Sequence, residues 1–185
     1  MKIRTAVAAV ANAAVIAAMI ATGVSGAKAQ QTKAPIIDYD IQIVDAAELV
    51  CLQQNIYFEA GNQSTMGKVA VAWVTLNRVE SSKYPTTICN VVKQGKRDAA
   101  GNMIKHKCHF SWYCDGKADV VGEGELEQRA WIDSLLVAEV VLLDWARARP
   151  SPVQDAVMYH ATYVEPYWAA SYSKVTQIES HIFYN

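Results

Sequence analysis

The sequence predicts an α+β domain that is mainly helical and has a small β element near its C-terminal end. Three stretches between residues 45 and 149 repeat apolar residues with the period of a helix. Residues 166–185 are instead rich in β-branched and aromatic residues, which favour strands. Helices and strands that are segregated along the chain indicate an α+β fold. The 185 residues favour one domain, and 52% hydrophobic residues are enough for a folded core.

Residues 1–29 have the pattern of an export signal. Lys2 and Arg4 precede an uncharged, Ala-rich stretch, and residues 27–29 have the small-x-small form of a cleavage site. We expect a signal peptide that is cleaved before Gln30, with an uncleaved signal anchor acting as a transient membrane tether as the alternative. An N-terminal arm then covers residues 30–43 and the folded domain residues 44–185. The expected location is the periplasm or cell envelope, or the medium.

The first predicted helix runs from Asp45 to about Ala60. Asp45 and the Glu three residues later have the pattern of a capping box, and Gly61 is a suitable residue for the end. Four positions fall within about 80° of arc at 100° per residue, and these are Leu49, Leu52, Ile56 and Glu59. Glu59 is therefore expected at the end of the buried stripe.

The later elements follow from similar signals. A second helix is expected at residues 66–81, capped by Ser64 or Thr65, and it is apolar enough to be central. A short apolar segment at 87–92 precedes a polar excursion at 93–109. A long helix is expected at 125–149, where Pro150 stops it. Residues 157–160, 175–178 and 182–184 are expected to be extended.

Glu59 is the first candidate for chemistry because it lies beside Tyr57 and Phe58. A carboxyl that is partly removed from water has a raised pKa and can act as a general acid. The alternative is an ordinary solvated residue at a helix end, which helical phase alone favours. The next acidic residue is Glu80, and any second carboxylate would have to come from elsewhere in the chain, where the candidates are Asp98, Asp115 and Asp119.

Several other functions lack their sequence patterns. The net charge of −1, without a basic run, argues against a nucleic-acid partner. No phosphate-binding glycine motif, Gly-x-Ser-x-Gly elbow or His-Glu-x-x-His spacing is present. A metal-dependent amidase remains an alternative, since the chain has enough histidines: His106, His109, His160 and His181. A cysteine nucleophile paired with His160 or His181 is another alternative.

The four cysteines predict two disulfides, because the chain is expected in an oxidising compartment. Proximity along the chain favours Cys108 with Cys114, which leaves Cys51 with Cys89. The alternative is a zinc site, for which the chain offers a compact set of ligands: His106, Cys108, His109 and Cys114.

Aromatic residues gather in segments that have the pattern of loops or extended chain. Flat rings of this kind can stack on sugars in a glycan groove, although most such side chains in small domains pack in the interior. The residues concerned are Trp112, Tyr113, Tyr159, Tyr163, Tyr167, Trp168 and Tyr172.

Five ordered blocks resemble one known family. "IYFEAGNQ" and "GKVAVAWVTLNRV" are similar to the opening of the cell-wall hydrolase family typified by the spore cortex-lytic enzyme. Three later blocks agree in order, and these are "YPTTICNVV", "HFSWYCDGK" and "MYHATYVEPYWA…HIFYN". The resemblance spans residues 44–185 and implies a lysozyme-like domain of the lytic transglycosylase type.

The resemblance implies cleavage of the glycan strands of peptidoglycan, with Glu59 as the single catalytic acid and base. It implies no cofactor and no metal, and we expect a monomer. Residues in the matching blocks that are expected to line the groove are Ser111, Tyr113, Tyr159 and His160. The alternatives are a hydrolytic muramidase, a peptidoglycan-binding module without catalysis, and an N-acetylmuramoyl-L-alanine amidase.

The chain departs from the family at one position, since Gln63 stands where members often have a second Glu. A mechanism that uses one carboxyl does not need that acid. The family also does not require the four cysteines, so the expected disulfides would be an adaptation to an oxidising compartment.

Overall fold

The computed structural model describes residues 45–185. The expected signal segment at 1–29 and the arm at 30–43 lie outside these described residues. In chain order the elements are α1 (Ala46–Ala60), α2 (Thr65–Glu80), α3 (Ile88–Val92), β1 (Gly95–Arg97), β2 (Met103–Cys108), the 3-10 helix η1 (Ser111–Cys114), α4 (Glu125–Ala146), β3 (Met158–Ala161), the 3-10 helix η2 (Ala169–Ser171), β4 (Lys174–Ile178) and β5 (His181–Tyr184).

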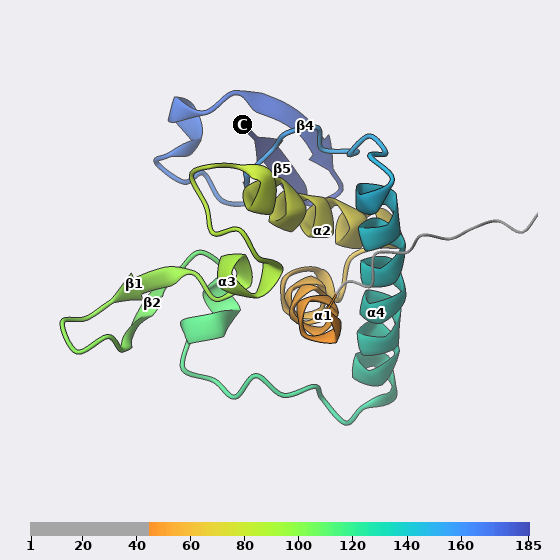
Figure 1. Cartoon of the computed structure of the whole chain (residues 1–185), viewed down its shortest axis with the longest axis horizontal. Helices are drawn as coiled ribbons and strands as arrows, with labels where there is room; N and C mark the ends of the chain where they lie inside the picture. Colours follow the sequence, from red (N-terminus) through yellow and green to blue (C-terminus); the bar gives the residue numbers. More distant parts are fainter. Residues whose placement is uncertain (1–44) are drawn as a thin grey trace, which may run out of the picture. The chain divides into compact units, whose positions relative to one another are not determined.

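The core is built around α1 and α2. Figure 1 shows α1 nearly end-on, with α3 and α4 on its two sides and α2 above it. Leu52 and Ile56 of α1 are fully buried, as are Val71 and Leu76 of α2, and Phe183 of β5 packs into the same cluster. Every side chain of α2 from Gly67 to Arg78 except Val69 is buried, which confirms that this helix is central.

A three-stranded antiparallel sheet forms the C-terminal part of the chain in the order β3-β5-β4. Tyr159 of β3 pairs with Phe183 of β5, and His160 pairs with Ile182. Because successive side chains of a strand point to opposite faces, Tyr159 and His160 lie on different sides of this sheet. The predicted extended segments and the α+β class are confirmed.

The polar excursion at 93–109 contains a hairpin that the sequence did not predict. β1 and β2 pair antiparallel, with Gly95 opposite Cys108, and the hairpin extends away from the helices in Figure 1. Most of its side chains are exposed on both faces. The alternation of apolar and polar residues that identifies a half-buried strand is therefore absent from this segment.

Two details at helix ends differ from the predictions. Asp45 caps α1 by accepting a hydrogen bond from the Ala47 amide at 2.9 Å. Glu48 does not complete a capping box. Its Oε2 instead accepts from the Ile88 and Cys89 amides, at the start of α3. The long helix ends at Ala146 rather than residue 149, because Arg147 leaves helical geometry and Ala148 adopts a φ of 52°.

A search of residues 45–185 for a helix that is both long and apolar enough to cross a bilayer finds none.

Candidate active site

Glu59 lies in the last turn of α1, and its carboxyl faces Tyr159 of β3. The Tyr159 hydroxyl donates a hydrogen bond to Oε2 of Glu59, with 2.8 Å between the two oxygens. Both residues are half-buried. Glu59 and Tyr159 are 100 positions apart in the sequence, and the fold brings them together. Glu59 was predicted as the catalytic acid, and Tyr159 was predicted independently as a residue of the substrate groove.

The surroundings of Glu59 shift its proton affinity in two directions. Burial is the largest influence and raises the pKa of the Glu59 carboxyl. The Tyr159 hydrogen bond, the charge of Arg78 and the backbone amide of Ser111 oppose it and lower that pKa. Burial and the neighbouring Glu59 charge raise the pKa of Tyr159 well above its ordinary value, so its hydroxyl stays a donor. The balance leaves Glu59 protonated to a higher pH than an exposed glutamate.

The end of α2 holds the segment that leads into β3. The Asn77 amide donates to the backbone oxygens of Gln154 and Ala156, both at 2.8 Å. The next residue, Arg78, donates through Nε to the Val157 oxygen at 2.8 Å. These three bonds fix the chain just before Tyr159. They give a physical role to the Leu-Asn-Arg-Val end of the second helix.

Arg78 brings a buried positive charge close to Glu59. Only 4% of its surface is exposed. Its guanidinium lies 4.6 Å from the Phe110 ring centre and 5.4 Å from that of Tyr84, which are cation–π distances. Its Nη1 is buried and has no hydrogen-bond partner within residues 45–185. Arg78 was not among the predicted site residues, although an arginine inside an apolar helix segment is a signal of a buried charge.

The 3-10 helix η1 is attached to α1 through Trp112. Its indole N–H donates to Oδ1 of Asn55 at 3.0 Å, and the amide of Asn55 donates to Oγ1 of Thr75 at 3.0 Å. The Trp112 ring also stacks on Phe58, with 4.6 Å between ring centres. These buried contacts hold the two neighbours of Trp112 near the end of α1. Ser111 is exposed and turns its amide to Glu59, while Tyr113 is half-buried with its ring edge against Trp112.

The face of the sheet that carries Tyr159 also carries His181 and Phe183. The His181 ring meets the Tyr159 ring edge-on at 5.3 Å between centres. Burial lowers the pKa of His181. Its Nδ1 is buried and unpartnered within the described part of the chain. His181 thus packs against Tyr159, whereas the sequence predicted it only as a partner of a metal ion or of a cysteine nucleophile.

His160 lies on the opposite face of the sheet. Its Nε2 is 2.9 Å from the Tyr184 hydroxyl, and its ring stacks on the Tyr184 ring. It also contacts the Trp168 ring edge-on and lines a separate hollow of about 600 Å³. The structure therefore does not bring the His160 side chain to Glu59 together with Tyr159.

Gln63, the position at which the resemblance leads us to expect a Glu, has a structural contact. Its Oε1 accepts a hydrogen bond from the Ser180 hydroxyl at 2.8 Å. Beside it, Oε2 of Glu179 accepts from the Ser64 amide at 3.2 Å. Both bonds join the turn between α1 and α2 to the turn between β4 and β5.

All four cysteines are in disulfides, Cys51 with Cys89 and Cys108 with Cys114. This is the pairing that proximity along the chain favours. It removes the thiolates that the alternative zinc site at 106–114 and a cysteine nucleophile would need. Residues 45–185 contain no group of three or more His, Cys, Asp or Glu placed to hold a metal ion.

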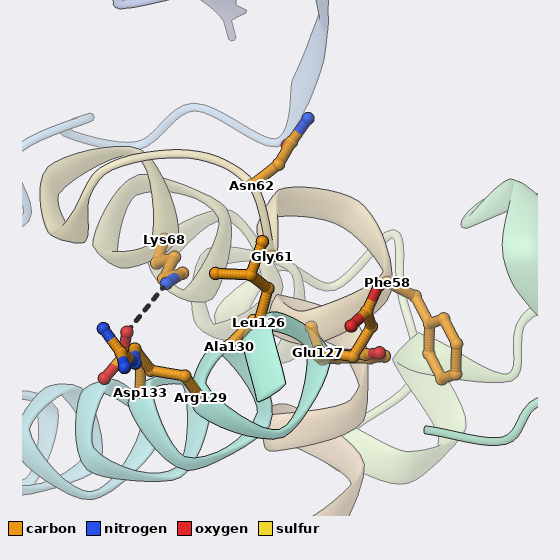
Figure 2. Close-up of a pocket in the computed structure, with 10 residues that line it drawn as sticks. Phe58, Gly61, Asn62, Lys68, Leu126, Glu127, Arg129, Ala130 and Asp133 are labelled. Atoms are coloured by element: carbon orange, nitrogen blue, oxygen red, sulfur yellow. Dashed lines mark ion pairs between the residues drawn. The ribbon is translucent and has the colours of Figure 1, made fainter. Parts of the chain in front are cut away.

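A hollow of about 550 Å³ lies on the other side of the last turn of α1; we call it the Lys68 hollow (Figure 2). Tyr57 and Gly61 line it one turn apart, so Glu59, two residues from each, points elsewhere. Its complete lining is Tyr57, Phe58, Gly61, Asn62, Lys68, Leu126, Glu127, Arg129, Ala130 and Asp133.

Comparisons with known proteins give one family and one fold. The sequence model described as Cell Wall Hydrolase matches residues 62–184, so the match begins three residues after Glu59. The chain is similar to the catalytic domain of the germination-specific lytic transglycosylase SleB from Bacillus anthracis, with 21% identity and a TM-score of 0.53 over 78% of this chain and 98% of that one. It is also similar to the catalytic domain of the Bacillus cereus SleB protein, with 22% identity and a TM-score of 0.49 over 75% and 89% of the two chains. None of the curated proteins compared with the chain matches it.

Proposed function

The chain belongs to the cell wall hydrolase family, and from this premise we propose that it cleaves the glycan strands of peptidoglycan with Glu59 as its only acid and base. The bond cut is the β-1,4 bond between N-acetylmuramic acid (MurNAc) and N-acetylglucosamine (GlcNAc). The product is a 1,6-anhydro-MurNAc end. The observation that supports this proposal most is the half-buried Glu59 carboxyl, with a raised pKa and a hydrogen bond from Tyr159.

In the first step the protonated Glu59 gives its proton to the glycosidic oxygen. The bond between that oxygen and C1 of MurNAc breaks, and the electron pair leaves with the GlcNAc oxygen. Tyr159 donates to Oε2 of Glu59, which assigns the acidic proton to Oε1. Burial supports this step, because it keeps the carboxyl protonated to a higher pH than that of an exposed glutamate.

In the second step the Glu59 carboxylate takes the proton of the C6 hydroxyl of the same MurNAc. The freed O6 forms a bond to C1, which closes the anhydro ring and returns Glu59 to its acid form. No water is consumed. The Tyr159 hydrogen bond and the Arg78 charge support this step, because both favour the carboxylate that exists between the two proton transfers.

One carboxyl is sufficient for this chemistry. The groups within residues 45–185 that shift the pKa of the Glu59 carboxyl are Tyr159, Arg78 and Ser111, and none of them carries a second carboxyl group. A pair of carboxylates flanking the bond is typical of most glycosidases. The surroundings of Glu59 agree better with an attack by the substrate's own hydroxyl than with that arrangement.

The test of this role is the substitution Glu59→Gln. Gln keeps the size of the side chain and an acceptor for Tyr159, but it has no proton to give. We expect the release of soluble fragments from purified peptidoglycan to fall at least about a hundredfold, as for loss of a general acid. The control is Glu139→Gln, which removes an exposed carboxylate from α4. Wild-type lysis by a folded Glu59→Gln protein would refute the assignment.

Thermal unfolding shows whether the variant is folded. Because the folded-state pKa of Glu59 is raised, the stability that this group contributes is present at low pH and is lost as the pH rises through that pKa. Above that pKa the ionised carboxyl therefore costs stability, and Gln removes that cost. We expect Glu59→Gln to unfold at neutral pH at a temperature no lower than that of the wild type.

A further inference from the structure

The Lys68 hollow contains a lysine whose charge is poorly satisfied. Lys68 has 6% of its surface exposed. Its ammonium lies 3.6 Å from Oδ2 of Asp133 on α4, which is an ion pair but longer than a hydrogen bond, and half of the Asp133 side chain is exposed. Figure 2 shows the Lys68 ammonium directed at this carboxylate. An ammonium has three donors, so Lys68 retains donors for a ligand.

The hollow presents charges of both signs. Lys68 and Arg129 contribute two positive charges, of which Arg129 is paired with Glu125 at 2.9 Å, and Glu127 and Asp133 contribute two negative charges. A ligand with one charge would meet a group of its own sign beside its partner. A ligand with an ammonium and a carboxylate on the same carbon would have a partner for each charge.

Peptidoglycan can supply such a group. In stem peptides that contain diaminopimelate, the end of that residue that is not cross-linked carries an ammonium and a carboxylate on one carbon. We propose that the Lys68 hollow binds this zwitterionic end, with Lys68 holding the carboxylate and Asp133 the ammonium. The inference rests on the proposed function, since it takes peptidoglycan as the substrate, and it adds the class of stem peptide that is preferred.

The position of the hollow assigns it to binding rather than to bond cleavage. Phe58, Gly61 and Asn62 connect it to the end of α1, while Glu59 points to another side of the helix. A stem peptide held there would raise the affinity for strands that carry peptides. Strands without peptides would still reach Glu59.

The test compares two substrates, namely strands with uncross-linked diaminopimelate peptides and the same strands stripped of peptides by an amidase. The measured quantity is the ratio of kcat/KM on the first to kcat/KM on the second. Lys68→Met and Asp133→Asn are each expected to lower this ratio about tenfold, the loss typical of one charge-assisted hydrogen bond. The control Arg149→Met removes an exposed charge that follows the end of α4 and does not line the hollow, and it is expected to keep the ratio.

Three outcomes would overturn the proposal. An unchanged ratio in folded Lys68→Met would mean that Lys68 only forms an ion pair. A higher ratio in Asp133→Asn would mean that the hollow takes a simple carboxylate. An equally large fall of the ratio in Arg149→Met would mean that the net charge of the protein alone causes the preference for strands that carry peptides.

A measurement on the wild type covers the case in which a variant does not fold. The probe is a soluble disaccharide tripeptide that ends in diaminopimelate, compared with the same molecule N-acetylated on its free ammonium. The acetylated probe is expected to bind about tenfold more weakly, and equal affinity would overturn the proposal. The proposed function is tested separately, because cleavage of stripped strands by the wild type depends on Glu59 and not on this hollow.

Discussion

At the scale of single residues, the surroundings of Glu59 shift the pKa of its carboxyl in opposite directions. Burial favours the acid, whereas Tyr159 and Arg78 favour the carboxylate. A group that donates a proton in one step and accepts one in the next needs both forms within reach at working pH. The two neighbours also come from different elements, so each can be changed without altering α1.

Tyr159→Phe tests the contribution of the hydroxyl. The Tyr159 hydrogen bond lowers the pKa of Glu59, so its loss is expected to raise that pKa further. Because the free enzyme needs the acid form, the alkaline limb of the kcat/KM profile is expected to move to higher pH. Maximal activity is expected to fall about tenfold, since the carboxylate loses a donor. The pH–rate profile measures both effects.

The matched control for that experiment is Tyr163→Phe, which removes a hydroxyl from a side chain that is 85% exposed. It is expected to leave the profile unchanged. An alkaline limb that stays in place or moves to lower pH in Tyr159→Phe would contradict the role given to the hydroxyl.

The positions of single residues could be predicted from the sequence where they depend on neighbouring residues of the same element. The helical phase predicted that Glu59 ends the stripe of Leu52 and Ile56, and the structure has it there. The contact with Tyr159 spans 100 positions, and no local pattern predicts it. Strand alternation implies that Tyr159 and His160 face opposite ways, but only the packing of the sheet determines which of them faces α1.

At the scale of elements, the α1–α2 turn is fixed by the β4–β5 turn. Gln63 and Ser64 are both bonded to residues 179–180. Gly67 permits this approach, because a Cβ there would lie 2.8 Å from Cβ of Gln63 and 3.1 Å from Oε2 of Glu179. Gln63 is thus used in this chain to join a helix turn to the sheet.

Periodicity and cap residues predicted the helices of the core and the strands of the C-terminal sheet. They did not predict the β1–β2 hairpin, whose exposed residues have no buried face to produce a pattern. They also did not predict that Glu48 would cap α3, because its partners, the Ile88 and Cys89 amides, are about 40 positions away. Contacts of that range depend on how the helices pack.

The two disulfides close loops of different length. We therefore expect their removal to lower the free energy of unfolding by different amounts. Cys51 and Cys89 close a loop of 38 residues between α1 and α3, whereas Cys108 and Cys114 close one of 6 residues. In the chain-entropy description these loops correspond to about 4 and about 2 kcal/mol of unfolding free energy.

Denaturant unfolding of two double variants measures this difference. Cys51→Ala with Cys89→Ala is expected to lose more stability than Cys108→Ala with Cys114→Ala. Equal losses, or the reverse order, would contradict the expectation.

At the scale of the whole molecule, the proposed function requires export, because peptidoglycan lies outside the cytoplasm. We propose that residues 1–29 direct export and are removed before Gln30. N-terminal sequencing of the protein recovered from the cell envelope is expected to begin at Gln30. A sequence that begins at the first residues of the chain would favour the retained anchor and contradict cleavage.

The central claim is that one carboxyl, Glu59, cleaves the glycan without water, and the mass of the products tests it most directly. Digestion of purified peptidoglycan in oxygen-18 water, followed by mass spectrometry, is expected to give fragments with anhydro ends. These are lighter by one water than reducing ends and carry no label. Fragments with labelled reducing ends would show hydrolysis and contradict the account.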